Sequence, residues 1–150
     1  MFFPFYFKLL SGLITFLVCS SLTGIEIPSK VTSIGSHAFW GCQNLTAVSF
    51  AESSALTSVG GDAFVATRLR FVEFPATLKT LGENCFEELR YVICNSVSKP
   101  TTQGPLKNDG ELTIFVPGES VDAYKESFPW NEYEILPIDR ASVTISKNEE

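Results

Sequence analysis

Residues 22–42 read LTGIEIPSKVTSIGSHAFWGC, and this stretch decides the fold because it recurs along the chain. A second copy, LTAVSFAESSALTSVGGDAFVATR, spans residues 45–68, and a third, LRFVEFPATLKTLGENCFEE, spans residues 69–88. A fourth copy opens with LRYVIC at residue 89. From one opening leucine to the next, the units are 23, 24 and 20 residues long. A near-constant period of this length is typical of a solenoid of stacked coils.

The units share columns of apolar residues at fixed offsets. The opening L-x-x-I-x-I pattern has apolar residues at alternate positions near its end, which suits a strand with one buried face. These columns hold Leu22, Ile25 and Ile27; Leu45, Val48 and Phe50; Leu69, Val72 and Phe74; and Leu89, Val92 and Cys94. A later column holds Phe39, Phe64 and Phe86, preceded by Ala38, Ala63 and Cys85. No unit can bury its apolar face alone, so the units must stack.

The repeat predicts four strands, at residues 22–27, 45–50, 69–74 and 89–94, which should be neighbours in one parallel sheet. Proline cannot donate to a strand ladder, so Pro28 and Pro75 should end their strands. In the middle of each unit, a glycine should permit a backbone turn that a side chain would obstruct. These glycines are Gly35, Gly60 and Gly82.

Residues 1–21 form an apolar leader with a single charge at Lys8. The apolar run after Lys8 has the length of a signal-peptide core and is short for a membrane span of about 20 residues. A second interpretation remains open, because Gly12, Phe16, Cys19 and Leu22 repeat the spacing of a full unit. In that unit the matching residues are Gly35, Phe39, Cys42 and Leu45. The leader is then a degraded repeat, and the chain a fragment of a longer array.

Beyond the repeats of residues 22–96, three further segments are expected. Residues 97–111 are rich in Pro, Gly and polar residues and predict a loop. Residues 112–138 are similar to the closing segment of many repeat chains of this kind, and this resemblance implies a strand-helix-strand cap, with Ser120 as the helix N-cap and Pro129 ending the helix. Residues 139–150 are interpreted as a tail or linker. A cap is expected because the last coil would otherwise expose its apolar column and its sheet edge.

Composition argues against several classes of function. The net charge is −6, which offers no attraction for a phosphate backbone, so we expect no nucleic-acid partner. Four cysteines and one histidine, His37, lack the close spacing of a zinc site, so we expect neither a metal nor a cofactor. No nucleophile motif or phosphate-binding glycine loop is present, so an enzyme is not predicted. We interpret Cys42, Cys85 and Cys94 as core residues and His37 as a surface residue.

Outward positions of the third and fourth strands offer a candidate binding face. In adjacent coils, about one strand spacing apart, Arg70 should lie beside Arg90 and Phe71 beside Tyr91. The next outward column pairs Glu73 with Ile93. Exposed aromatic and arginine residues are frequent anchors of protein interfaces, so the candidate site residues are Arg70, Phe71, Glu73, Arg90 and Tyr91. Ordinary ladder pairing, or cover by the 97–111 loop, is the alternative.

These units resemble the BspA-type leucine-rich repeat family, whose pattern is roughly L-x-x-I-x-I-P-x-x-V-x-x-I-G-x-x-A-F-x-x-C. The resemblance implies an α/β-type repeat solenoid of leucine-rich-repeat-like coils, with a short-stranded parallel sheet and a cap. It further implies a secreted or cell-surface protein that adheres to a host or bacterial surface or matrix protein. Membrane contact would come only through the N-terminal apolar segment, if that segment is retained. The alternative is a structural spacer, or a fragment of a longer array with no binding role of its own.

Overall fold

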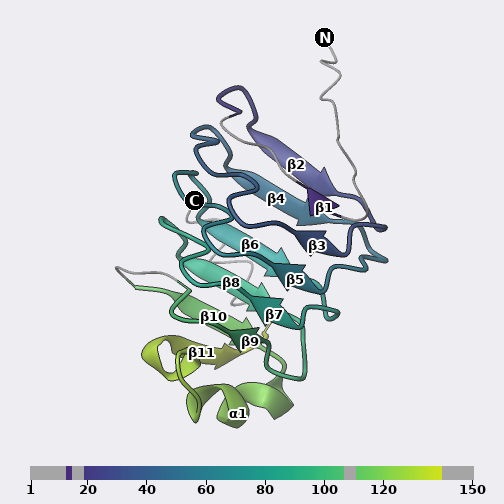
Figure 1. Cartoon of the computed structure of the whole chain (residues 1–150). Coiled ribbons are helices and arrows are strands. Elements are labelled where there is room, and N and C mark those ends of the chain that lie inside the picture. The colour runs from purple at the N-terminus through teal and green to yellow at the C-terminus, as the bar shows by residue number, and fades with distance from the viewer. Residues whose placement is uncertain (1–12, 15–18, 107–110, 140–150) are drawn as a thin grey trace.

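In a computed structural model, which describes residues 13–14, 19–106 and 111–139, the chain forms a solenoid of stacked coils. The long strands run parallel and follow one another in chain order along one side (Figure 1). They are β2 (Gly24–Ile27), β4 (Ala47–Phe50), β6 (Phe71–Phe74), β8 (Tyr91–Cys94), β10 (Thr113–Val116) and β11 (Glu134–Pro137). The four predicted strands are therefore confirmed. Each begins two residues later than expected, because the opening leucine lies in the turn before it.

A second parallel sheet of very short strands runs along the other side of the coils. Its order is β1 (Leu13–Ile14), β3 (Ser33–Ile34), β5 (Ser58–Val59), β7 (Thr80–Leu81) and β9 (Thr101–Thr102). The repeat pattern did not predict this sheet. Strand β9 lies inside the 97–111 segment that was expected to be a loop, and Leu106 of the same segment is buried. That segment therefore contributes to a further coil before the cap.

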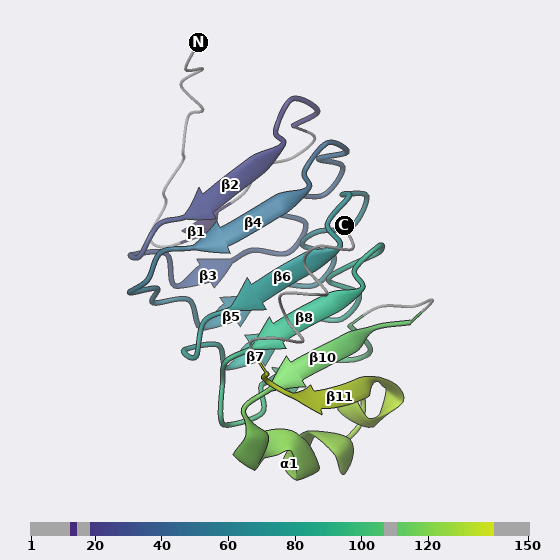
Figure 2. The same cartoon turned by 180° about the vertical axis from the view of Figure 1, so that it is seen from behind.

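The prediction of one continuous sheet is wrong at the boundary between β4 and β6. These strands lie side by side (Figures 1 and 2), but the hydrogen-bonded order is β2-β4 in one sheet and β11-β10-β8-β6 in another. Between β2 and β4 and between β6 and β8, a hydrogen bond joins equivalent residues just before the strands, as where Arg90 N–H donates to Arg70 O at 2.9 Å. Between β4 and β6, Arg68 N–H instead donates to Leu45 O at 3.0 Å. We attribute the break to this shift in register.

An aromatic stack runs through the core between the two sheets. The rings of Phe39, Phe64 and Phe86 lie nearly parallel, with centroids 5.0 and 5.4 Å apart. Cys85 and the alanines that precede the first two rings are fully buried. The predicted Ala-Phe column is therefore the spine of the core, and Cys85 belongs to it as expected.

The mid-unit glycines serve close packing rather than the turn that was predicted. A Cβ atom on Gly60 would lie 2.3 Å from Ser36 N, and one on Gly82 would lie 2.2 Å from Gly61 N. The left-handed backbone falls two residues further on, at His37, Asp62 and Asn84, whose φ angles are 59°, 55° and 50°. The glycines therefore let neighbouring coils approach, while non-glycine residues make the turn.

The cap closes the last coil with helical turns and one strand. Its elements are η1 (Gly118–Ser120), α1 (Val121–Lys125), η2 (Trp130–Glu132) and β11. Tyr124 packs edge-on against Trp130 with centroids 4.9 Å apart, and its hydroxyl donates to Ser96 O at 3.2 Å. Ser120 occupies the N-cap position, but its hydroxyl donates to Val97 O at 2.8 Å and does not cap the helix. The expected capping role of Ser120 is therefore wrong, and Ser120 ties the cap to the coil beneath it.

The N-terminal segment joins the solenoid where it is described. Strand β1 pairs with β3 in a register that aligns Ile14 with Ile34. Leu22 N–H donates to Cys19 O, just as Leu45 N–H donates to Cys42 O in the next coil. The degraded-repeat interpretation is supported over these residues. The paired residues of β1 and β3 are 20 residues apart in the sequence, however, and not the 23 that the matched glycines implied. Residues 1–12 and 15–18 lie outside the described part of the chain.

Candidate binding surface

The two arginines of the candidate face precede neighbouring strands, Arg70 before β6 and Arg90 before β8. Both side chains are exposed. The N–H groups of Arg90 and Tyr91 both donate to Arg70 O, at 2.9 and 3.0 Å. Arg70 therefore lies directly beside Arg90, as the sequence predicted, and the two form a positive pair at one end of the strands.

The aromatic pair lies next along the same strands, with Phe71 in register with Tyr91. Both side chains are half-buried, because they pack against a second apolar cluster formed by Ile93 and Phe115. Ile93 and Phe115 are each only 3 % exposed. The prediction that Ile93 lies on an open outward column is therefore wrong. The four residues form a small second core on the outer side of the sheet.

Glu73 is the acidic residue of the candidate face, and it accepts a hydrogen bond from an amide. Its Oε1 accepts a hydrogen bond from Asn95 Nδ2 at 3.3 Å, and Asn95 Nδ2 also donates to Phe74 O at 2.9 Å. Within the described residues, neither arginine forms an ion pair with Glu73; the ion pair found there joins His37 to Asp62. The positive charge of the arginine pair is therefore left for solvent or for a partner.

The outer face changes character at the β4–β6 boundary. On β2 and β4 the outward residues are small or polar and exposed: Gly24, Glu26, Ala47 and Ser49. On β8 and β10 the last three residues of each strand are all buried, so these strands are covered on both faces. The sequence carried a signal for this difference, since three consecutive apolar residues in VIC and IFV are typical of a strand buried on both sides.

A groove that the sequence did not predict follows the second sheet. It has a volume of about 440 Å³ and runs across β3, β5, β7 and β9. Every strand contributes at least one hydroxyl to its lining: Ser33, Ser58, Thr80, Thr101 and Thr102. Among the described residues that line it, none is a His, Cys, Asp, Glu, Lys or Arg. The groove can offer hydrogen bonds, but it lacks a base to activate any hydroxyl as a nucleophile.

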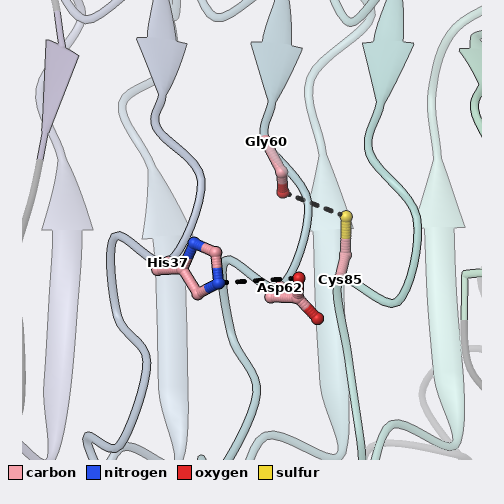
Figure 3. Close-up of polar contacts among 4 residues, drawn as sticks. All are labelled: His37, Gly60, Asp62 and Cys85. Atoms are coloured by element: carbon pink, nitrogen blue, oxygen red, sulfur yellow. Dashed lines mark hydrogen bonds and ion pairs between the residues drawn. The ribbon is translucent and has the colours of Figure 1, made fainter.

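His37 lies on the surface, as expected, with its side chain 55 % exposed (Figure 3). Its Nε2 atom is 3.7 Å from Asp62 Oδ2 on the next coil, a pair too exposed to stabilise the fold by much. Beneath Asp62, the Cys85 thiol donates to Gly82 O at 2.9 Å and contacts Gly60 O at 3.4 Å. Burial, with the charge of Asp62, raises the pKa of the Cys85 thiol to about 12. Cys85 is therefore a structural thiol and not a nucleophile.

Over the described residues, no group of three or more His, Cys, Asp or Glu side chains is arranged to hold a metal ion. The same residues include no helix of the length and apolarity needed to cross a membrane.

A family model for the BspA type leucine rich repeat region matches residues 12–127 in six copies. The chain belongs to this family. The match begins ten residues before the first full unit, which agrees with the pairing of β1, and it runs on into the cap. No curated protein matches the chain at a significant level. Members of the BspA-type family are often surface proteins involved in binding, and the repeat is typically non-enzymatic.

Proposed function

We propose that this BspA-type repeat protein is a secreted or cell-surface module that adheres to a host or bacterial surface or matrix protein. The contact surface would be the outer face of β6 and β8, through Arg70, Phe71, Glu73, Arg90 and Tyr91. Attachment to a membrane, if any, would come through the N-terminal apolar segment. The observation that supports this proposal is the exposed arginine pair beside half-buried aromatic rings.

This combination has the anatomy of a protein interface. Interfaces typically have an apolar centre with a polar rim, and they are enriched in aromatic residues and arginine. Rings already held by Ile93 and Phe115 would lose little conformational entropy on binding. The two arginines would favour a partner with carboxylates, because guanidinium groups bind carboxylates in bidentate geometry. An acidic protein patch therefore suits this face, whereas the net charge of −6 disfavours nucleic acid.

The chemistry of the two surfaces supports a non-enzymatic role. The groove holds hydroxyls without a base among its described lining residues, and on the candidate face the carboxylate of Glu73 accepts a hydrogen bond from Asn95. Catalysis of hydrolysis or group transfer would need such a pair positioned together. We therefore propose passive binding, with the structural-spacer role as the competing function.

The test measures attachment of protein-coated beads to the matrix left by cultured epithelial cells after the cells are removed. We expect Arg70→Ala with Arg90→Ala to weaken attachment at least tenfold, or about 1.4 kcal/mol. The matched control is Lys30→Ala with Lys79→Ala, which also removes two exposed positive charges but from other places on the solenoid. The control should attach like the unmodified protein.

Two outcomes would count against the proposal. Equal attachment by both double variants would remove this face as the contact surface. No attachment by the unmodified protein, across matrix and bacterial cells, would favour the spacer.

A further inference from the structure

We propose that Cys19 and Cys42 form an intramolecular disulfide that fastens the N-terminal coil to the first full repeat when the protein meets a small-molecule disulfide. This inference does not depend on the proposed function. It concerns the N-terminal end of the solenoid, away from the candidate face.

The two cysteines occupy the same column of adjacent coils. Both follow the same local pattern, since Leu22 N–H donates to Cys19 O at 3.2 Å and Leu45 N–H donates to Cys42 O at 2.9 Å. Further contacts hold the two turns together. Asn44 Nδ2 donates to Ser20 O at 2.6 Å, and both the N–H and the hydroxyl of Thr46 donate to Thr23 O.

This stacking sets a separation that a disulfide can span. Adjacent coils lie about 4.8 Å apart, and disulfide-bonded cysteines have Cα atoms about 4.4–6.8 Å apart. The Cys42 thiol is in hydrogen-bond contact with both the backbone and the thiol of Cys19. Both cysteines are free thiols in this structure. The sulfur atoms are therefore already neighbours before any bond forms.

Exposure fixes the order of the two exchange steps. Cys19 is half-buried and reachable from solvent, whereas Cys42 is fully buried. Burial raises the pKa of the Cys42 thiol and shields it from solvent, so oxidised glutathione reaches the Cys19 sulfur first. The Cys19 thiolate attacks oxidised glutathione, forming a mixed disulfide and releasing one glutathione thiolate. The Cys42 thiol passes its proton to the glutathione thiolate released in the first step, and its sulfur attacks Cys19 Sγ. The second glutathione leaves as a thiolate and takes a proton from water, so two protein thiols are oxidised and one glutathione disulfide is reduced to two thiols.

The other two cysteines provide an internal comparison. The Cys85 thiol donates to backbone carbonyls, and the Cys94 thiol lies 3.4 Å from the Tyr124 hydroxyl. Both are fully buried, and neither contacts another cysteine. They should stay reduced under conditions that oxidise Cys19 and Cys42.

The experiment uses the full chain, reduced and then incubated with oxidised glutathione near pH 8. Thiols counted after rapid denaturation should fall from four to two. Trypsin digestion without reductant should give a linked pair of peptides, residues 9–30 and 31–68, each with one cysteine. Cys85→Ala, which places the alanine of the other coils in that column, should form the same link and end with one free thiol.

Cys19→Ser alters a half-buried side chain, and it should keep all three remaining thiols free after the same treatment. The inference is overturned if four thiols persist in the unmodified protein. It is also overturned if glutathione stays attached to Cys19 while Cys42 remains free, since that outcome shows the second step cannot occur.

Discussion

The ring of Phe64 lies parallel to the ring of Phe39, with 5° between their planes and 5.0 Å between their centroids. Phe86 continues the stack on the other side of Phe64 at 5.4 Å. Each ring therefore packs against the next coil as well as its own. The stability of one coil thus depends on the identity of a residue one repeat away, which is the nearest-neighbour coupling expected of a solenoid.

Truncation of the central ring tests this coupling. Phe64→Ala should lower the free energy of unfolding by about 3–5 kcal/mol, since a buried aromatic side chain leaves a cavity touching both neighbours. Chemical denaturation followed by circular dichroism measures the change. Phe128→Ala is the control, because Phe128 is 66 % exposed and its loss should have almost no effect. Equal effects of the two changes would contradict the assignment of Phe64 to the core.

Close approach of neighbouring coils makes a second prediction. Gly82→Ala should destabilise the protein by about 1–3 kcal/mol or more, because the new methyl group would collide with the backbone of Gly61. Gly118→Ala is the matched control, since nothing lies within 4 Å of the added Cβ. Thermal melts of the two variants should differ clearly. A Gly82→Ala variant as stable as the Gly118→Ala variant would mean that the coils are not packed this tightly.

Alkaline pH should destabilise the protein through Cys85. The folded-state pKa of about 12 lies above the ordinary value of 9.0, so below pH 9 the thiol is protonated in both states. Between pH 9 and 12 the unfolded chain loses this proton first, and stability falls by about 1.4 kcal/mol per pH unit. Unfolding at pH 7.5 and 10.5 should show a loss about 2 kcal/mol larger in the unmodified protein than in Cys85→Ala. Identical losses would show that Cys85 does not resist ionisation.

Alternation of apolar residues was enough to predict the long strands, the recurrence of the units predicted the Ala-Phe column, and the resemblance to a known repeat family implied the cap. Alternation failed for the second sheet, because strands of two residues such as Ser33–Ile34 carry too little periodicity to detect. It also failed at Ile93, whose side chain was predicted to be exposed because it points to the outer face of the sheet. The alternation of side chains along a strand tells which face a residue is on, but whether that face is buried depends on the neighbours that cover it. The left-handed backbone conformation of His37 and Asp62 was not predicted, because the glycine two positions earlier was expected to make the turn.

The second core makes a prediction about the aromatic pair. Phe71→Ser with Tyr91→Ser should cost about 1–2 kcal/mol for each ring, since both rings are half-buried against Ile93 and Phe115. The repeat core should survive, so circular dichroism should still report the folded solenoid. A change of under 0.5 kcal/mol would mean that the outer cluster adds nothing to stability. Complete unfolding would show that the outer cluster is as essential to the fold as the main core.

The missing ladder between β4 and β6 has a mechanical consequence for a molecule that is pulled. On the side of the long strands, β4 and β6 are joined by side-chain packing, such as the contact between the Phe50 and Phe74 rings, whose centroids are 5.7 Å apart. On the opposite side of the coils, β5 and β7 are hydrogen-bonded to each other. Tension applied to the two ends would therefore separate β4 from β6, and the two parts of the solenoid would rotate about the second sheet. We expect this seam between β4 and β6 to separate under tension before the hydrogen-bonded ladders on either side of it do.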